Sequence, residues 1–241
     1  MNAVEGRRRA IAVSGTGVML AAVPARAQVT PGREERIVDA QTTATEELML
    51  EHGVLRRCLA VFGESAARLS GRGNGGPVPA DALRDAVALF IGFGGQLHER
   101  RIEEEIVFPQ VSRIDETLDA TAKVLKFQHD RGQQILGWVQ DRTREGRIGR
   151  GDDRPVADAL AGFVRMYTYH AALEDTVVFP RWKLSLKGDQ HRELVRRFEE
   201  IQAKEIGRDG LANALERLVA IESAFHLGQL AQWTAPPPPG R

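Results

Sequence analysis

Residues 163–180 read FVRMYTYHAALEDTVVFP, and this stretch decides the fold because its residues repeat with the period of a helix. Phe163, Tyr167, His170, Glu174 and Val177 follow one another at steps of four, three, four and three residues. They therefore share one face of an α-helix, and this face is the apolar one that packs in a core. A carboxylate buried there without a partner costs several kcal/mol, so Glu174 needs a cation.

Three earlier segments have the same design, each with one histidine on its apolar face. The histidines are His52 between about Thr43 and Leu69, His98 between about Ala80 and Phe108, and His129 between about Leu118 and Arg144. The fourth helix begins near Pro155 and ends at Phe179-Pro180. Four long helices with short loops predict an all-α, up-down-up-down four-helix bundle.

Composition limits the class of protein. The chain has 241 residues, with 33 basic and 33 acidic side chains, which suits one globular domain or two small ones. Residues 1–27 contain four arginines and one glutamate, so the remainder has 29 basic and 32 acidic side chains. This mildly acidic body argues against binding to nucleic acid. The single cysteine, Cys58, excludes an intrachain disulfide and any site built from several cysteines.

The amino terminus has the pattern of an export signal. Arg7-Arg8-Arg9 precedes an uncharged stretch from Ala10 to Pro24 and then Ala25-Arg26-Ala27, so residues 1–27 are predicted to be cleaved after Ala27. The adjacent arginines resemble a twin-arginine signal and predict a periplasmic or otherwise exported protein. A Sec signal or an uncleaved helix are the alternatives. Residues 28–42 are predicted to be a linker, and no later segment approaches the ~18 apolar residues of a membrane span.

The carboxyl-terminal part is predicted to be a helical extension over residues 183–230. It contains two shorter amphipathic helices, at about Gln190 to Glu205 and about Leu211 to Phe225. Residues 231–241 form a proline-rich tail that includes Pro236 to Pro239. The sequence assigns no function to this extension.

Two of the helices end in the same motif. Residues 103–109 read EEEIVFP and residues 174–180 read EDTVVFP, which gives the shared pattern E-[ED]-x-[IV]-V-F-P, each preceded by a histidine. The sequence therefore predicts two similar helical hairpins related by a pseudo-twofold axis. Histidines and carboxylates that converge from several helices of a bundle bind two transition-metal ions, and these residues alone leave iron, manganese and zinc open.

These features resemble the hemerythrin-like HHE cation-binding family, whose pattern is His, H-x-x-x-E, His and H-x-x-x-E on successive helices. The matching segments are Glu51-His52-Gly53, the His98 segment ending in Phe108-Pro109, Gln128-His129, and His170 to Glu174. The predicted domain spans residues 43–182.

The resemblance implies a hemerythrin-type bundle with two non-haem iron ions, manganese or zinc being less favoured. The implied nitrogen ligands are His52, His98, His129 and His170, and the implied bridging carboxylates are Glu103 and Glu174. The implied partners are dioxygen or small oxidants and an unidentified redox partner.

Two departures from the family pattern affect the site. His98 and Glu103 are five residues apart rather than four, which places them about 140° apart on an α-helix, with Ile102 in the regular place. Either a one-residue π-bulge restores the alignment or one ligand is lost, and the matching distance from Glu103 to Phe108-Pro109 favours the bulge. Glu99 and Glu104 are the fallback ligands.

The second departure is Gln133, four residues after His129, where oxygen-carrying hemerythrins have a second histidine. One ion would then have an additional open position for water or peroxide, which favours reactivity over reversible oxygen carriage. The leading hypothesis is a protein that binds or reacts with dioxygen, peroxide or nitric oxide. A di-iron peroxidase or oxidase and a metal-stabilised structural or iron-storage module are the alternatives.

Other polar residues near the motifs receive weaker assignments. Tyr167 is either a hydrogen-bond donor to a bridging carboxylate or bound oxygen species, or a core residue. The residues expected to face solvent or the arginines Arg100 and Arg101 are Glu104, Glu105 and Asp175. His191 and His226 lie beyond the bundle and are expected at the surface or in the core.

Overall fold

The computed structural model describes residues 42–73, 75–235 and 237–238. Within these residues every regular element is a helix and there is no strand, so the all-α prediction is confirmed. The predicted signal peptide, the linker before Thr42 and two of the four consecutive prolines lie outside the described residues. Among the described helices, none has the length and apolar character needed to cross a bilayer.

The bundle consists of four long helical segments, two of which change helix type along their length. The first is α1 (Ala44–Leu69), and the second runs from α2 (Ala80–Leu89) through the π-helix η1 (Phe90–Val107) into α3 (Phe108–Val111). The third is α4 (Glu116–Arg142), and the fourth runs from α5 (Asp153–Leu173) through the π-helix η2 (Glu174–Val178) into α6 (Phe179–Ser185).

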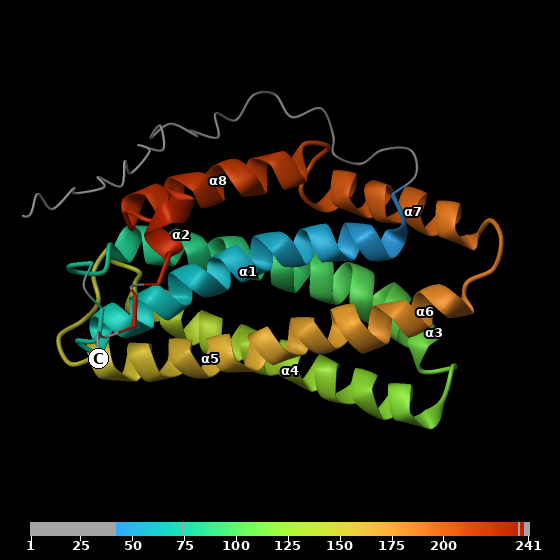
Figure 1. The fold of residues 1–241 in the computed structure, drawn as a ribbon, viewed down its shortest axis with the longest axis horizontal. Helices are drawn as coiled ribbons and strands as arrows, with labels where there is room; N and C mark the ends of the chain where they lie inside the picture. Colours follow the sequence, from blue (N-terminus) through green and yellow to red (C-terminus); the bar gives the residue numbers. More distant parts are fainter. Residues whose placement is uncertain (1–41, 74, 236, 239–241) are drawn as a thin grey trace, which may run out of the picture. The chain divides into compact units, whose positions relative to one another are not determined.

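The order of packing is that of a closed bundle. Both α1 and α4 pack against α5 on one side and against the α2–η1 segment on the other (Figure 1). Sequential neighbours are therefore spatial neighbours, and the fourth segment returns to the first. This is the arrangement predicted for a hemerythrin-type four-helix bundle.

The helix starts are set by short polar side chains. The backbone N–H and hydroxyl of Thr43 both donate to Glu46, at 2.6 and 2.8 Å. Asp115 accepts a hydrogen bond of 3.0 Å from the backbone N–H of Leu118. Both contacts satisfy groups that the first turn of a helix leaves unpaired, so α1 and α4 begin within two residues of the predicted positions.

The prediction that helices end at Pro109 and Pro180 is wrong, because α3 and α6 continue beyond them. Proline lacks an N–H and would clash with the carbonyl four residues earlier in a regular α-helix. Here the preceding turn is wider: Phe108 N–H donates to the Glu103 carbonyl and Phe179 N–H donates to the Glu174 carbonyl, each five residues back. Each proline then occupies the first turn of a new α-helical segment, where no donor is required.

The carboxyl-terminal helices cover one hairpin of the bundle. Helix α7 (Gln190–Glu205) packs on α1 and η1, and α8 (Gly210–Ala224) packs on α1 and α2 (Figure 1). Phe198 and Phe225 are buried, and they belong to the same hydrophobic core as the bundle. A short 3₁₀ turn, η3 (Leu230–Trp233), follows. The extension is therefore continuous with the core and lies mainly against the first hairpin.

Candidate metal centre

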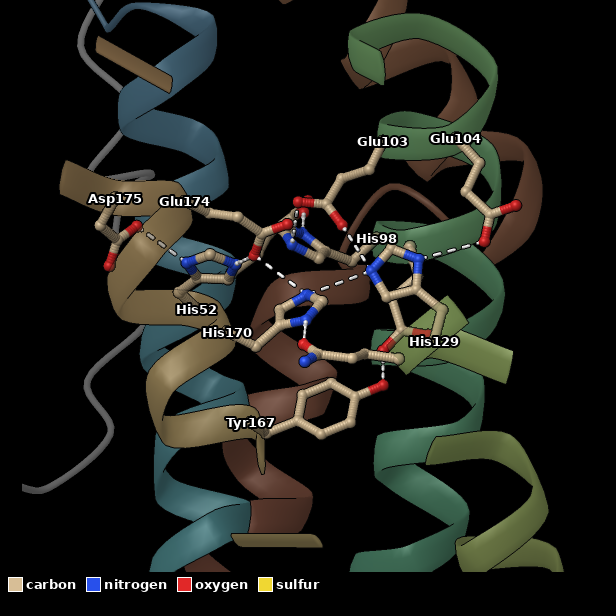
Figure 2. Close-up of polar contacts among 12 residues, drawn as sticks. His52, His98, Glu103, Glu104, His129, Tyr167, His170, Glu174 and Asp175 are labelled. Atoms are coloured by element: carbon tan, nitrogen blue, oxygen red, sulfur yellow. Dashed lines mark hydrogen bonds and ion pairs between the residues drawn. The ribbon is translucent and has the colours of Figure 1, made fainter. Parts of the chain in front are cut away.

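All six side chains predicted as ligands lie together in the middle of the bundle (Figure 2). None has more than 3% of its surface exposed, and Phe108 stacks on the ring of His129 while Phe179 packs at a tilt against the ring of His52. The six residues are His52 from α1, His98 and Glu103 from η1, His129 from α4, His170 from α5, and Glu174 at the start of η2.

The ligand atoms form two groups, which we call the first and second positions. The first position consists of His52, His98 and Glu103, with one ligand atom from each within 4.8 Å of the others. His98 Nε2 lies 3.3 Å from Glu103 Oε1. His52 Nε2 lies 3.5 Å from Glu174 Oε2, so this carboxylate also borders the first position.

The second position consists of Glu103, His129, His170 and Glu174, again within 4.8 Å of one another. The Nε2 atoms of His129 and His170 are 3.2 Å apart. His129 Nε2 lies 3.3 Å from Glu103 Oε2, and His170 Nε2 lies 3.2 Å from Glu174 Oε2. Because Glu103 directs one oxygen to each position, its carboxylate lies between them as a bridge would.

The five-residue spacing from His98 to Glu103 is accommodated by π-helical backbone, as the motif comparison favoured. In a π-helix hydrogen bonds join residues i and i+5, so residues five apart return to one face. The structure extends this conformation over 18 residues, Phe90–Val107, rather than confining it to one inserted residue. Ile102, in the regular α-helical place, is instead fully buried in the core.

Each histidine at the first position has its other ring nitrogen, Nδ1, beside a carboxylate, which can only accept, so Nδ1–H is the donor. His52 Nδ1 lies 2.8 Å from Asp175 Oδ1, and His98 Nδ1 lies 2.6 Å from Glu51 Oε2. With the proton on Nδ1, the lone pair of Nε2 points to the centre of the bundle. This is the tautomer that binds a metal through Nε2.

The second position repeats this arrangement with one chemical difference. His129 Nδ1 lies 3.1 Å from Glu104 Oε1, and His170 Nδ1 lies 2.8 Å from the amide oxygen Oε1 of Gln128. The partner of His170 is thus neutral, whereas the other three partners are carboxylates.

Sequence reasoning did not identify these four residues as partners of the imidazoles. Glu104 does pair with Arg100 as expected, but it also accepts from His129, and Asp175 faces His52 and Arg56 rather than Arg100 or Arg101. Glu105 pairs with Arg101, as expected. A signal was present, because each partner is a chain neighbour of a predicted ligand. Glu51 and Gln128 precede His52 and His129, and Glu104 and Asp175 follow Glu103 and Glu174.

Negative charge accumulates in this centre. The carboxylates of Glu51, Glu99, Glu103 and Glu174 are at most 2% exposed. No lysine or arginine among the described residues makes an ion pair with any of them. Four buried acids without such partners are strongly unfavourable unless cations offset them.

The unpaired atoms aim at the same space. Both oxygens of Glu103 and of Glu174 and the Nε2 atom of His98 are buried without a hydrogen bond. Imidazole nitrogens together with carboxylate oxygens are the donors that iron, manganese and zinc accept. The residues present therefore fit two transition-metal ions, whose charges as divalent ions would match the four acids.

The neighbouring acids favour the protonated forms of His98 and His129 when no metal is bound. Burial alone would lower the pKa of His129, but Glu99, Glu103 and Glu104 outweigh it and raise the pKa to about 10. Burial is likewise outweighed at His98, where Glu103 and Glu51 raise the pKa well above its ordinary value. Conversely, His98 and His129 hold the pKa of Glu103 well below its ordinary value, against the effect of burial.

A small cavity adjoins the centre on the side of Tyr167. The cavity volume is about 10 Å³, close to what one water molecule requires. Its wall is formed by metal-facing imidazoles together with polar and apolar neighbours, including His52, His98, His170, Arg56, Glu99 and Tyr167. A molecule about the size of water can therefore lie beside three of the predicted ligands.

Tyr167 and Glu99 form a polar pair in the wall of this cavity. The hydroxyl of Tyr167 donates to Glu99 Oε1 at 2.7 Å, and the ring of Tyr167 stacks on His170 (Figure 2). Tyr167 thus contacts Glu99 rather than a bridging carboxylate. Neither fallback ligand, Glu99 or Glu104, joins the two ligand groups. Gln133, the residue four positions after His129, packs directly against Gly95. A Cβ added to Gly95 would lie 1.6 Å from the Nε2 atom of Gln133.

The two remaining histidines lie away from the centre. His191 is half-buried at the start of α7, and His226 is exposed after α8. Neither belongs to a metal-binding group among the described residues, in agreement with the sequence prediction.

The comparisons with known proteins bear on this arrangement. A family model described as the hemerythrin HHE cation binding domain matches residues 43–182. The chain belongs to the hemerythrin HHE family. The match covers α1 through most of α6, and therefore all the side chains that form the two positions, but it ends before the α7–α8 extension of this hemerythrin domain protein.

Similar proteins occur in mycobacteria. Proteins from Mycobacterium bovis and from two strains of Mycobacterium tuberculosis, CDC 1551 and H37Rv, are each 30% identical over 242 aligned residues. The alignment covers 96% of this chain and 92% of each relative, so it includes most of the extension, and all three relatives carry the description uncharacterized protein. No solved structure gives a significant match.

Proposed function

We propose that this protein is a non-haem di-iron protein that binds or reacts with dioxygen, peroxide or nitric oxide. The observation that supports the proposal is the pair of ligand groups sharing Glu103, both buried and rich in unpaired donor atoms. Under this proposal His52, His98, His129 and His170 are terminal ligands, and Glu103 and Glu174 are bridging ligands.

The donor set favours iron in this setting. Mixed imidazole and carboxylate ligands suit iron, manganese and zinc, and hemerythrin family membership favours iron among them. Two bound iron ions would supply Lewis acidity and electrons for a small oxidant.

The side chains of the chain itself orient and isolate the centre. The four residues that accept from Nδ1 fix the orientations of the imidazole rings. Glu51 orients His98 in the first hairpin, and Gln128 orients His170 in the second. Phe62, Phe90 and Phe163 pack together with ring centroids 5.0 to 6.0 Å apart, and Phe90 and Phe163 also pack on Tyr167. This apolar cluster helps to exclude water on the Tyr167 side.

Metal analysis combined with absorption spectra tests the proposal. Protein purified from cells supplied with iron is expected to contain close to two iron ions per chain, and its oxidised form is expected to show the bands of an oxo-bridged iron pair. Retention of two ions and an unchanged spectrum in the His170→Ala variant would contradict the proposal. Uptake of fewer than two ions by the native protein would also contradict it.

A peroxidase or oxidase is the second candidate, favoured by the polar wall of the cavity. The Tyr167–Glu99 pair places hydrogen-bonding groups beside the space next to three imidazoles, whereas reversible carriage of dioxygen needs only a stable bound state. Spectra recorded in air and under argon separate the two candidates. A colour that disappears on removal of oxygen and returns with it supports carriage, whereas steady consumption of peroxide with a reductant supports the enzyme.

A further inference from the structure

The α7–α8 extension reaches one of the two metal positions through a chain of hydrogen bonds. Gln202 of α7 donates from Nε2 to Glu51 Oε1 at 2.6 Å, and the other oxygen of Glu51 accepts from His98 Nδ1 at 2.6 Å. His98 in turn directs Nε2 toward Glu103. The extension therefore contacts a predicted metal ligand through a single intervening side chain.

Among the residues that the structure describes, the second position has no equivalent of this connection. There the residue that corresponds to Glu51 is Gln128, because each immediately precedes a predicted ligand histidine in α1 or α4 and accepts from the histidine of the following helical segment. Gln128 is neutral and half-buried, whereas Glu51 is only 2% exposed. The main contacts of α7 are with α1 and η1, the two segments that carry Glu51 and His98.

The charge difference changes the two positions in a definite direction. A carboxylate that accepts a hydrogen bond from the Nδ1–H of an imidazole stabilises positive charge on the ring. It therefore makes Nε2 a stronger electron-pair donor to a metal ion than an amide partner does. At the first position both imidazoles have carboxylate partners, Asp175 and Glu51. At the second position one partner is a carboxylate and the other is an amide.

A buried carboxylate must itself be held in place. Glu51 has no lysine or arginine partner among the described residues, so its two hydrogen bonds are what offset its burial. Removal of the Gln202 amide would leave Oε1 of Glu51 without its donor beneath α7.

We propose that Gln202 of α7 is a positioning residue that makes the two metal positions unequal, so that the first position, formed by His52, His98 and Glu103, binds its ion more tightly and fills first. This inference rests on the proposed di-metal function and extends it to the α7–α8 extension.

The test is a titration of the full-length, metal-free protein with Co²⁺ followed by absorbance, repeated with Fe²⁺ under argon. The native protein is expected to bind in two separable steps. Gln202→Leu is expected to weaken the tighter step by up to about tenfold and leave the weaker step unchanged, and Glu51→Gln to weaken it by about 10- to 100-fold, the range found for partners of metal ligands.

Two further variants separate positioning from simple loss of packing. Gln202→Lys keeps a donor for Glu51 and is expected to retain the native tighter step. Glu205→Gln removes the ion pair of 3.1 Å between α7 and Arg101 of η1 without touching Glu51, and it is expected to leave both steps unchanged.

The outcomes distinguish this inference from the proposed function. Two equal steps in the native protein, an unchanged tighter step in Gln202→Leu, or an equal loss in Glu205→Gln would each overturn the inference while the di-metal centre stands. Uptake of fewer than two ions by the native protein would overturn both.

Discussion

The two hairpins of the bundle carry the same closing motif but place their ligands by different backbone geometry. In the second hairpin His170 and Glu174 are four residues apart. The π-helix η2 there is only five residues long and begins at Glu174, after the histidine. In the first hairpin His98 and Glu103 are five residues apart, and the π-helix η1 spans 18 residues on both sides of the histidine.

The difference shows that the centre fixes the positions of side chains rather than the spacing of residues. One additional residue between histidine and carboxylate is absorbed by i to i+5 hydrogen bonding, so that Glu103 and Glu174 both reach the centre. The side chain that packs against a glycine also differs between the hairpins. Leu55 lies against Gly94 in the first hairpin, and Tyr167 of the second hairpin lies against Gly132.

The largest expected effect distinguishes the two bridging carboxylates. Glu103 belongs to both ligand groups, whereas Glu174 belongs to one and borders the other through a single oxygen 3.5 Å from His52 Nε2, so Glu103→Ala is expected to leave close to zero bound ions and Glu174→Ala about one. Metal content of each purified variant, measured by atomic emission after anaerobic reconstitution, checks this difference. Equal metal content in the two variants would show that the hairpins contribute equivalent ligands.

Removal of metal tests whether the hairpins depend on a shared centre. Ligands that bind only the folded state stabilise it by about 4 kcal/mol at 1,000 times the dissociation constant, which corresponds to roughly 10 °C in Tm for a chain of this size. Thermal unfolding followed by circular dichroism is expected to show a drop of this order after chelation and recovery after iron is restored. A Tm that is the same with and without metal would mean that packing alone joins the hairpins.

The metal-free protein is expected to lose stability as the pH rises. His129 has its pKa raised to about 10, so its contribution is complete below the ordinary value of 6.5 and is lost as pH rises through about 10. The lowered pKa of Glu103 has the opposite sign, and its contribution is lost as pH falls below 4.5.

Thermal unfolding at pH 6.5 and pH 9 measures this effect. The metal-free Tm is expected to be lower at pH 9, whereas metal-bound protein, whose histidines are already deprotonated ligands, is expected to change less. The same fall in both forms would argue against protons being held at the empty ligand positions.

The smallest expected effect concerns the glycine that faces Tyr167. A Cβ added to Gly132 would lie 2.4 Å from the Tyr167 hydroxyl and 2.7 Å from its ring, so Gly132→Ala is expected to cost about 1–3 kcal/mol and to displace Tyr167 from Glu99. Gly137→Ala on the same helix meets no atom within 4 Å and is expected to stabilise by about 0.5–1 kcal/mol. Urea unfolding of both variants compares them, and equal stabilisation would mean that the packing at Tyr167 is loose.

Much of the bundle could be predicted because its signals are local. The helical period located four long segments, and the histidines on their apolar faces identified side chains that the structure brings together. The continuation through Pro109 and Pro180 could not be predicted, since it depends on a wide turn that the usual rule for proline does not anticipate.

The partners of the imidazoles were also beyond prediction from periodicity. Asp175 and Glu104 lie off the apolar faces, and only the docking of neighbouring helices places them beside His52 and His129. The contact of Gln202 with Glu51 spans 151 residues of sequence, and no local pattern specifies it.

The cavity beside the imidazoles has a consequence for the reagents that the proposed centre would meet. A cavity of about 10 Å³ is close to what one water molecule requires, so an alkyl hydroperoxide or an organic reductant would not fit beside the imidazoles without movement of the wall. Selection at such a centre would favour the smallest oxidants, and a bulky electron donor would act from outside the cavity wall.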